Sequence, residues 1–175
     1  LSALNLLRRD AVDALTKKLF PQRTPVKTAE LPEHTPLPEA KNSASFTRPE
    51  EIPDDIRKYF ELVYIPLERF HDYISSASGE KKIPGVVNGV AIPPAVFDSE
   101  LDEIRGMLRE AAENGIRDAL VSNPGHIALA REAGMTPHGD LRLNIYNRFT
   151  ADALLKIGFA DLTASPELTI PQLRD

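Results

Sequence analysis

The sequence contains no cysteine. The chain therefore has no disulfide, no thiolate nucleophile and no cysteine ligand of its own for an iron–sulfur cluster. It has no apolar run long enough to cross a bilayer. Arg8, Arg9 and Asp10 interrupt the first apolar stretch, so the sequence shows no signal peptide. We therefore expect a cytoplasmic protein that does not bind membranes.

Several signatures of known enzyme classes are also missing. There is no glycine-rich phosphate loop and no Gly-x-Ser-x-Gly elbow. His126 and His138 stand apart and lack the spacing typical of a metal site. The net charge of −5 argues against a general nucleic-acid-binding surface, although it permits a local basic groove.

Proline is concentrated in one segment and divides the chain into three parts. Residues 1–20 have the periodicity of an amphipathic helix. Residues 21–55 are rich in proline and poor in periodic apolar signal, which is typical of an extended linker that buries little. Residues 56–175 have a globular pattern. Because helical patterns are interrupted at both ends, we expect a fragment of a longer protein, with the barrel truncated at its carboxyl end.

Short apolar segments alternate with helical patterns throughout residues 56–175. This alternation indicates parallel βα units. Gly134 and Gly158 follow two of the predicted helices, at the position where a left-handed cap favours glycine. We predict an α/β fold in which parallel (βα) repeats form a partial TIM-like barrel, preceded by the N-terminal helix and the proline-rich linker. The predicted strands are 60–65, 86–92, 119–123, 140–145 and 160–163.

Polar residues near the carboxyl ends of the predicted strands are candidates for substrate binding, because ligands collect there in βα folds. Several of them also precede predicted helices, where the same residue types cap free backbone N–H groups, and capping alone explains such residues more often. Glu167 is the candidate catalytic residue, with a general base, a hydrogen-bond acceptor or a helix-start charge as open roles. The substrate-binding candidates are Asn123, Asp140, Arg142, Asn144, Asn147 and Ser165.

The predicted strand 140–145 alternates between apolar and polar side chains. Because helices cover the outer face of a βα barrel, we predict that the apolar set packs under helices and the polar set points inward. Buried charges need partners, so its acid and its arginine are expected to pair, either in a substrate site or as a structural ion pair. The apolar set is Leu141, Leu143 and Ile145, and the polar set is Asp140, Arg142 and Asn144.

Three motifs, in this order, resemble the collagenase-like peptidase family U-32. They are residues 120–125 (LVSNPG), 139–147 (GDLRLNIYN) and 165–168 (SPEL). The segment 5–9 (NLLRR) is similar to the Asn-x-Leu-Arg-Arg segment of longer members. The resemblance covers residues 60–175 and implies the C-terminal barrel portion of a long member. The expected partner is then the remainder of the same polypeptide, which includes a first barrel.

The resemblance also implies competing activities. The family name implies a fragment of a peptidase, a hydrolase that acts on peptides. Other members are implicated in hydroxylating RNA bases or a quinone precursor, with an iron–sulfur cluster held by cysteines downstream of the Ser-x-Glu-Leu motif. The second interpretation is therefore an enzyme that hydroxylates RNA bases, in rRNA or tRNA, with an iron–sulfur cluster supplied outside this segment. A third reading is a non-catalytic binding or scaffold half-barrel. No complete nucleophile–base set is visible, so we expect the isolated segment to be inactive and to hold no cofactor itself.

Overall fold

The computed structural model describes residues 2–19, 42–53, 55–75 and 87–174. The chain divides into two compact units, residues 1–34 and 35–175. The first unit contains helix α1 (Ser2–Leu19), which confirms the predicted N-terminal helix. Its apolar side chains Leu4 and Leu7 are exposed. No helix among the described residues is long and apolar enough to cross a bilayer.

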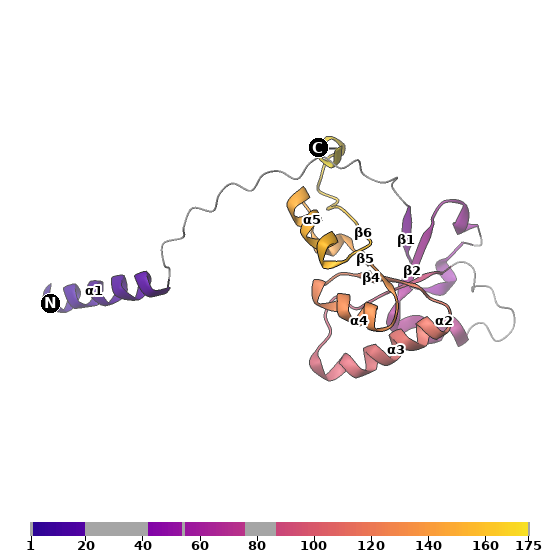
Figure 1. Ribbon diagram of the computed structural model, residues 1–175, viewed down its shortest axis with the longest axis horizontal. Helices are drawn as coiled ribbons and strands as arrows, with labels where there is room; N and C mark the ends of the chain where they lie inside the picture. The colour runs from indigo at the N-terminus through magenta and orange to yellow at the C-terminus, as the bar shows by residue number, and fades with distance from the viewer. Residues whose placement is uncertain (1, 20–41, 54, 76–86, 175) are drawn as a thin grey trace. The chain divides into compact units, whose positions relative to one another are not determined.

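The second unit is built on one sheet of six parallel strands, whose neighbours follow chain order. Figure 1 shows β1 and β2 on one side of the sheet and β5 and β6 on the other. This is the arrangement of a TIM-barrel wall, in which each strand is followed by a crossover and lies beside the previous one. The sheet forms a half-barrel with helices between its strands, as predicted. The strands are β1 (Ser43–Ser45), β2 (Leu62–Pro66), β3 (Gly89–Ala91), β4 (Asp118–Val121), β5 (Thr136–Gly139) and β6 (Asp161–Leu162).

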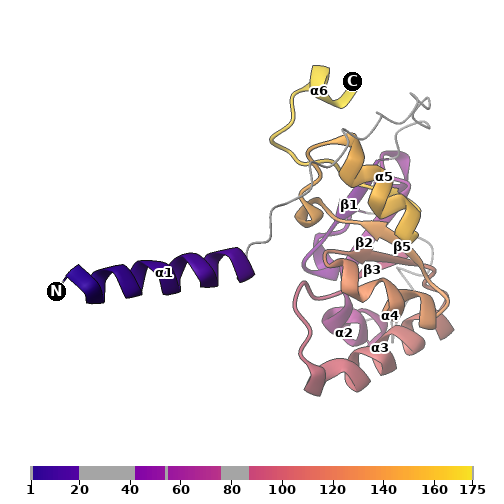
Figure 2. The same ribbon diagram turned by 60° about the vertical axis from the view of Figure 1, so that its left-hand side comes forward.

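Helices follow the strands, and in Figure 2 α3 and α4 lie together on one side of the sheet. The left-handed caps predicted at Gly134 and Gly158 are present, with φ of 74° and 117°. The helices are α2 (Phe70–Ser75), α3 (Leu101–Glu113), α4 (Ile127–Glu132), α5 (Arg148–Ile157) and α6 (Ile170–Arg174). Short 3-10 turns lie at Pro49–Glu51, Ile56–Lys58, Leu67–Arg69, Asp98–Glu100, Pro124–His126 and Leu141–Leu143.

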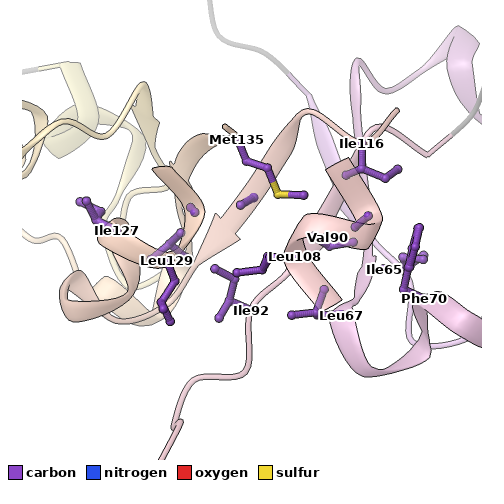
Figure 3. Close-up of a cluster of buried hydrophobic side chains, with 14 of the residues drawn as sticks. Ile65, Leu67, Phe70, Val90, Ile92, Leu108, Ile116, Ile127, Leu129 and Met135 are labelled. Carbon is purple, nitrogen blue, oxygen red and sulfur yellow. The ribbon is translucent and has the colours of Figure 1, made fainter. Parts of the chain in front are cut away.

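One face of β2, β3 and β4 is completely buried. Its side chains alternate along each strand with those of the opposite face. They meet the apolar stripe of α3, where Leu108 is fully buried and Ile104 and Ala111 lie on the same side (Figure 3). The side chains of this helix-covered face that have no exposed area are Val63, Ile65, Val90, Ala119 and Val121.

Strand β1 lies within the segment 21–55, which the sequence pattern presents as a linker. Ser43, Ala44 and Ser45 pair in parallel with β2, and Phe46 and Ile52 pack against the core. The expectation of a segment without packed structure is therefore wrong for these residues, while 21–41 lie outside the described part of the chain. Small polar residues carry little strand signal, and the pairing depends on the edge that β2 supplies.

The strand predicted at 140–145 is wrong. β5 ends at Gly139, and a 3-10 turn occupies Leu141–Leu143. The Asp140 carboxylate accepts a hydrogen bond from the Leu141 N–H at 2.8 Å, and Asn144 adopts a left-handed φ of 56°. Asp and Asn form such local bonds readily, and these bonds compete with a strand ladder.

The inside–outside assignment that rested on that strand also fails in part. Leu141 is 48 % exposed, and Arg142 and Asn144 face solvent rather than the barrel interior. Ile145 is buried and Leu143 packs against the core, so two of the three apolar residues do contribute to packing.

We predict that Leu108→Ala lowers the free energy of unfolding by about 2–5 kcal/mol, because it leaves a cavity between α3 and the sheet. Leu155→Ala on α5 is the matched control, since Leu155 is 46 % exposed. Urea denaturation followed by circular dichroism measures both. Equal losses for the two variants would contradict the assignment of the core.

Candidate functional site

The carboxyl ends of β4, β5 and β6 bring three chain segments together, which we call the rim. Val121, Gly139 and Leu162 are paired across these strands. The backbone N–H of Asp140 donates to the Val121 carbonyl at 3.0 Å, and that of Thr163 donates to the Gly139 carbonyl at 2.8 Å. The rim is therefore built by the residues that leave each strand, where parallel sheets bind ligands.

Asp140 is the centre of a hydrogen-bond network on the rim. Its Oδ2 accepts from Ser122 Oγ at 2.6 Å and from Arg142 Nη1 at 3.1 Å, and its Oδ1 accepts from the Leu141 N–H. Asp140 is only 6 % exposed, and the three donors offset the cost of burying its charge. The predicted pairing of Asp140 with Arg142 is confirmed.

Arg142 extends outward from this network. Its side chain is 62 % exposed, although Nη1 is tied to the buried carboxylate. A guanidinium carries five N–H donors in a fixed plane. The contact with Asp140 therefore orients the group while leaving donors directed to solvent.

A second polar group joins the segments after β5 and β6. Ile145 forms a parallel bridge with Ala164, and the Ser165 N–H donates to the Ile145 carbonyl at 3.0 Å. Tyr146 then donates its hydroxyl proton to the carboxylate of Glu167. Ser165 is buried, and its Oγ accepts a long hydrogen bond of 3.4 Å from the Glu167 N–H. The structure thus places Ser165 and Glu167 together, with Tyr146 as a partner that the sequence pattern did not single out.

Two candidate residues cap helical turns. Asn123 Oδ1 accepts from the Gly125 N–H at 3.0 Å, and Asn147 Oδ1 accepts from the Thr150 N–H at 2.9 Å. The capping interpretation is confirmed for both. Asn144 is exposed and ends the 3-10 turn in the left-handed conformation, so its geometry is accounted for by the backbone.

The inner face of the half-barrel, opposite the helix-covered face, carries a polar group that sequence reasoning missed. His138 Nε2 lies 2.9 Å from Asp118 Oδ1, and His138 Nδ1 lies 2.8 Å from Asp161 Oδ2. The ring of Tyr64 is 6.1 Å from that of His138. The three residues are separated by about twenty positions in the chain, so the group is hidden until the strand register is known.

Residues of β4 and β6 raise the pKa of His138 on β5. Burial alone would lower the pKa of His138, but the hydrogen bonds and negative charges of Asp118 and Asp161 outweigh it and raise the pKa to about 9. Burial, with the same two carboxylates, raises the pKa of the neighbouring Tyr64. Elsewhere, burial lowers the pKa of His126. Tyr64 and His126 also have buried polar atoms, Oη and Nδ1, without a protein hydrogen-bond partner.

The rim offers hydrogen-bond donors and acceptors but no serine–histidine pair. Ser122 donates directly to Asp140, and both ring nitrogens of His138 face other carboxylates. Among the described residues, no three His, Cys, Asp or Glu side chains gather in a way that could hold a metal ion. Without cysteine, the residues of this chain do not fit an iron–sulfur cluster.

Comparison with protein-family models, with curated proteins and with solved structures finds no match to this chain. The assignment of its function therefore depends on the motifs and on the geometry of the rim.

We predict that Asn147→Ala destabilises the protein by about 0.5–2 kcal/mol, because α5 loses its N-terminal cap. Asn147→Asp keeps the accepting oxygen and should restore most of that stability. Thermal unfolding of the two variants measures the difference. A stability-neutral Asn147→Ala would show that the cap contributes nothing and would reopen a ligand-binding role for Asn147.

Proposed function

We propose that this chain is the substrate-binding half-barrel of an enzyme of the collagenase-like U-32 type, and that its rim binds an anionic substrate. RNA is the substrate class we favour, in line with a hydroxylation-linked RNA-modifying enzyme. The observation that carries the proposal is the buried Asp140, which holds Ser122 and Arg142 at the carboxyl end of the sheet.

The chemistry of Arg142 supports an anionic ligand. A guanidinium fixed on one side by a carboxylate presents its remaining donors in a defined direction, which suits the oxygens of a phosphate or a carboxylate. Ordering a free arginine on binding costs conformational entropy. Arg142 is already oriented by Asp140, so part of that cost is met before a ligand arrives.

The same geometry weakens the peptidase reading. A serine nucleophile needs a base that accepts its proton and returns it to the leaving group. The acceptor of Ser122 is Asp140, which is already paired with Arg142 and the Leu141 N–H. Glu167 is occupied by Tyr146, and it remains the candidate catalytic residue as an acid, a base or a hydrogen-bond acceptor toward substrate.

We propose that the remainder of a longer polypeptide supplies what this chain lacks. In the U-32-type reading, that part contains a first barrel and cysteines for an iron–sulfur cluster. The residues described here would then bind and orient substrate beside it. A scaffold role without chemistry is the remaining alternative, and it predicts no dependence of ligand binding on Arg142.

We predict that Arg142→Gln weakens the binding of a fluorescein-labelled single-stranded RNA about five- to tenfold, because one phosphate contact is lost. The magnitude of the slope of log K against log salt should fall by about 0.7, the value for one phosphate contact on a single strand. Fluorescence anisotropy with the whole chain, at several salt concentrations, measures both quantities.

The matched control is Arg109→Gln. Arg109 lies on α3, which packs on the helix-covered face of the sheet, and its guanidinium is exposed. It should leave the RNA affinity and the salt slope nearly unchanged. If both variants bind like the parent chain, Arg142 and the rim are not the binding site. If the parent chain does not bind RNA at all, the proposed substrate class is wrong.

We also predict that the purified chain does not hydrolyse gelatin. Ser122 donates to Asp140, and Glu167 accepts from Tyr146. Among the described residues, neither side chain is paired with a histidine that could act as a base. Zymography and release of free amines test this directly. Gelatin cleavage that disappears in Glu167→Gln, while the fold is retained, would favour the peptidase reading.

A further inference from the structure

We propose that His138 is a positioning residue that ties the edge strand β6 to the half-barrel and thereby fixes the rim segment 163–167. It does so as an imidazolium held between Asp118 of β4 and Asp161 of β6. We call this group the inner-face clasp. Its functional meaning rests on the rim site proposed above, whereas the positioning itself is measurable without any ligand.

The geometry of the clasp requires two donors on one ring. Asp118 Oδ1 and Asp161 Oδ2 face the two ring nitrogens of His138 at 2.9 and 2.8 Å. An ionised carboxylate only accepts hydrogen bonds, and neutral imidazole has a single N–H. Only the imidazolium satisfies both contacts, so removal of one proton leaves a nitrogen lone pair against a carboxylate.

β6 is the shortest strand of the sheet. It consists of Asp161 and Leu162 alone, and within the described part of the chain β5 is its single neighbour. Few ladder hydrogen bonds therefore hold it, and short edge segments open more easily than central strands. The clasp adds a side-chain tie that spans β4, β5 and β6 at the level of the Leu120–His138–Asp161 register.

The rim segment 163–167 begins two residues after Asp161, which the clasp holds. Thr163 follows Leu162, Ala164 bridges to Ile145, and Glu167 meets Tyr146. The side chain of Leu162 also lies against Gly139, where a β-carbon would come within 2.6 Å of it. Displacement of β6 would therefore move Ser165 and Glu167 relative to the segment after β5.

Three titratable groups face His138: Asp118 from β4, Asp161 from β6 and Tyr64 from β2. The ring of Tyr64 passes over Gly89, where a β-carbon would lie 2.3 Å from it. The pKa of His138 is raised above its ordinary value to about 9. A raised histidine pKa stabilises the fold fully below the unfolded value of about 6.5, and that contribution is lost as pH rises through about 9.

The test is amide hydrogen exchange of the whole chain at neutral pH, in the parent and in His138→Gln. The probes are the amides of Thr163 and Ser165, which donate to Gly139 and Ile145, and the reference is the Ile92 amide, which donates to Leu120 in the sheet centre. Local opening of β6 should raise exchange of the two probes about tenfold or more relative to Ile92. His71→Gln is the matched control, because the His71 side chain is exposed and pairs with Glu110 on α3, away from β6.

A pH titration separates positioning from a merely structural role. The methyl resonances of Leu162 and Ala164 should follow the His138 ring signal through a transition near pH 9. In His138→Gln that transition should vanish, while a methyl of Ile104 on α3 should show none in either protein.

If His138→Gln fails to fold, Asp161→Ala gives the same test, because it removes the oxygen that faces His138 Nδ1, while the Asp161 side chain is 44 % exposed and the contact with Asp118 remains. The proposal would be overturned if exchange of the two probes, relative to Ile92, were the same in these variants as in the parent. Methyl signals that do not follow His138 would also overturn it. Neither experiment on the clasp involves RNA. Failure of the rim proposal would therefore leave the result for His138 unaffected.

Discussion

The complete burial of one face of β2, β3 and β4 is the constraint on which the rest of this structure depends. The apolar side chains of β2, β3 and β4 that point to that face have no exposed area, and α3 covers them with Leu108. Burial on this scale contributes about 25 cal/mol per Å² of apolar surface and dominates the stability of such a layer. Because strand side chains alternate, satisfying this face also determines which residues point to the other face.

The two networks of buried charge described above lie on the inner face and at the rim. Asp118, His138 and Asp161 share the inner face because they occupy matching or adjacent register positions on β4, β5 and β6. Asp140 follows the last residue of β5, and a local turn directs its carboxylate to Ser122 and Arg142. In both groups, buried charges are accompanied by the donors they need.

The fold class could be predicted from the sequence, whereas much of the site could not. Alternating apolar segments and the glycines at helix ends indicated a partial barrel, and α4 and α5 end just before Gly134 and Gly158, as predicted. The segment 140–145 shows where such reasoning fails. Its alternating pattern favours a strand, but the strand ends at Gly139, because the Asp140 carboxylate accepts from the next backbone N–H and Asn144 takes a left-handed φ. Pro137 lies inside the actual strand, where a missing N–H would ordinarily argue against one.

The sequence by itself determined the properties that are set by near neighbours in the chain. These are the helices, their glycine caps, the caps at Asn123 and Asn147, and the alternation of side chains between the two faces of each strand. What only the tertiary structure decided is which distant residues meet. The pairing of Ser43–Ser45 with β2 and the meeting of Asp118, His138 and Asp161 depend on strand register. The contact between Tyr146 and Glu167 depends on the bridge between Ile145 and Ala164. Register is fixed by the packing of the whole sheet on its helices, and a one-residue shift would move every side chain to the other face.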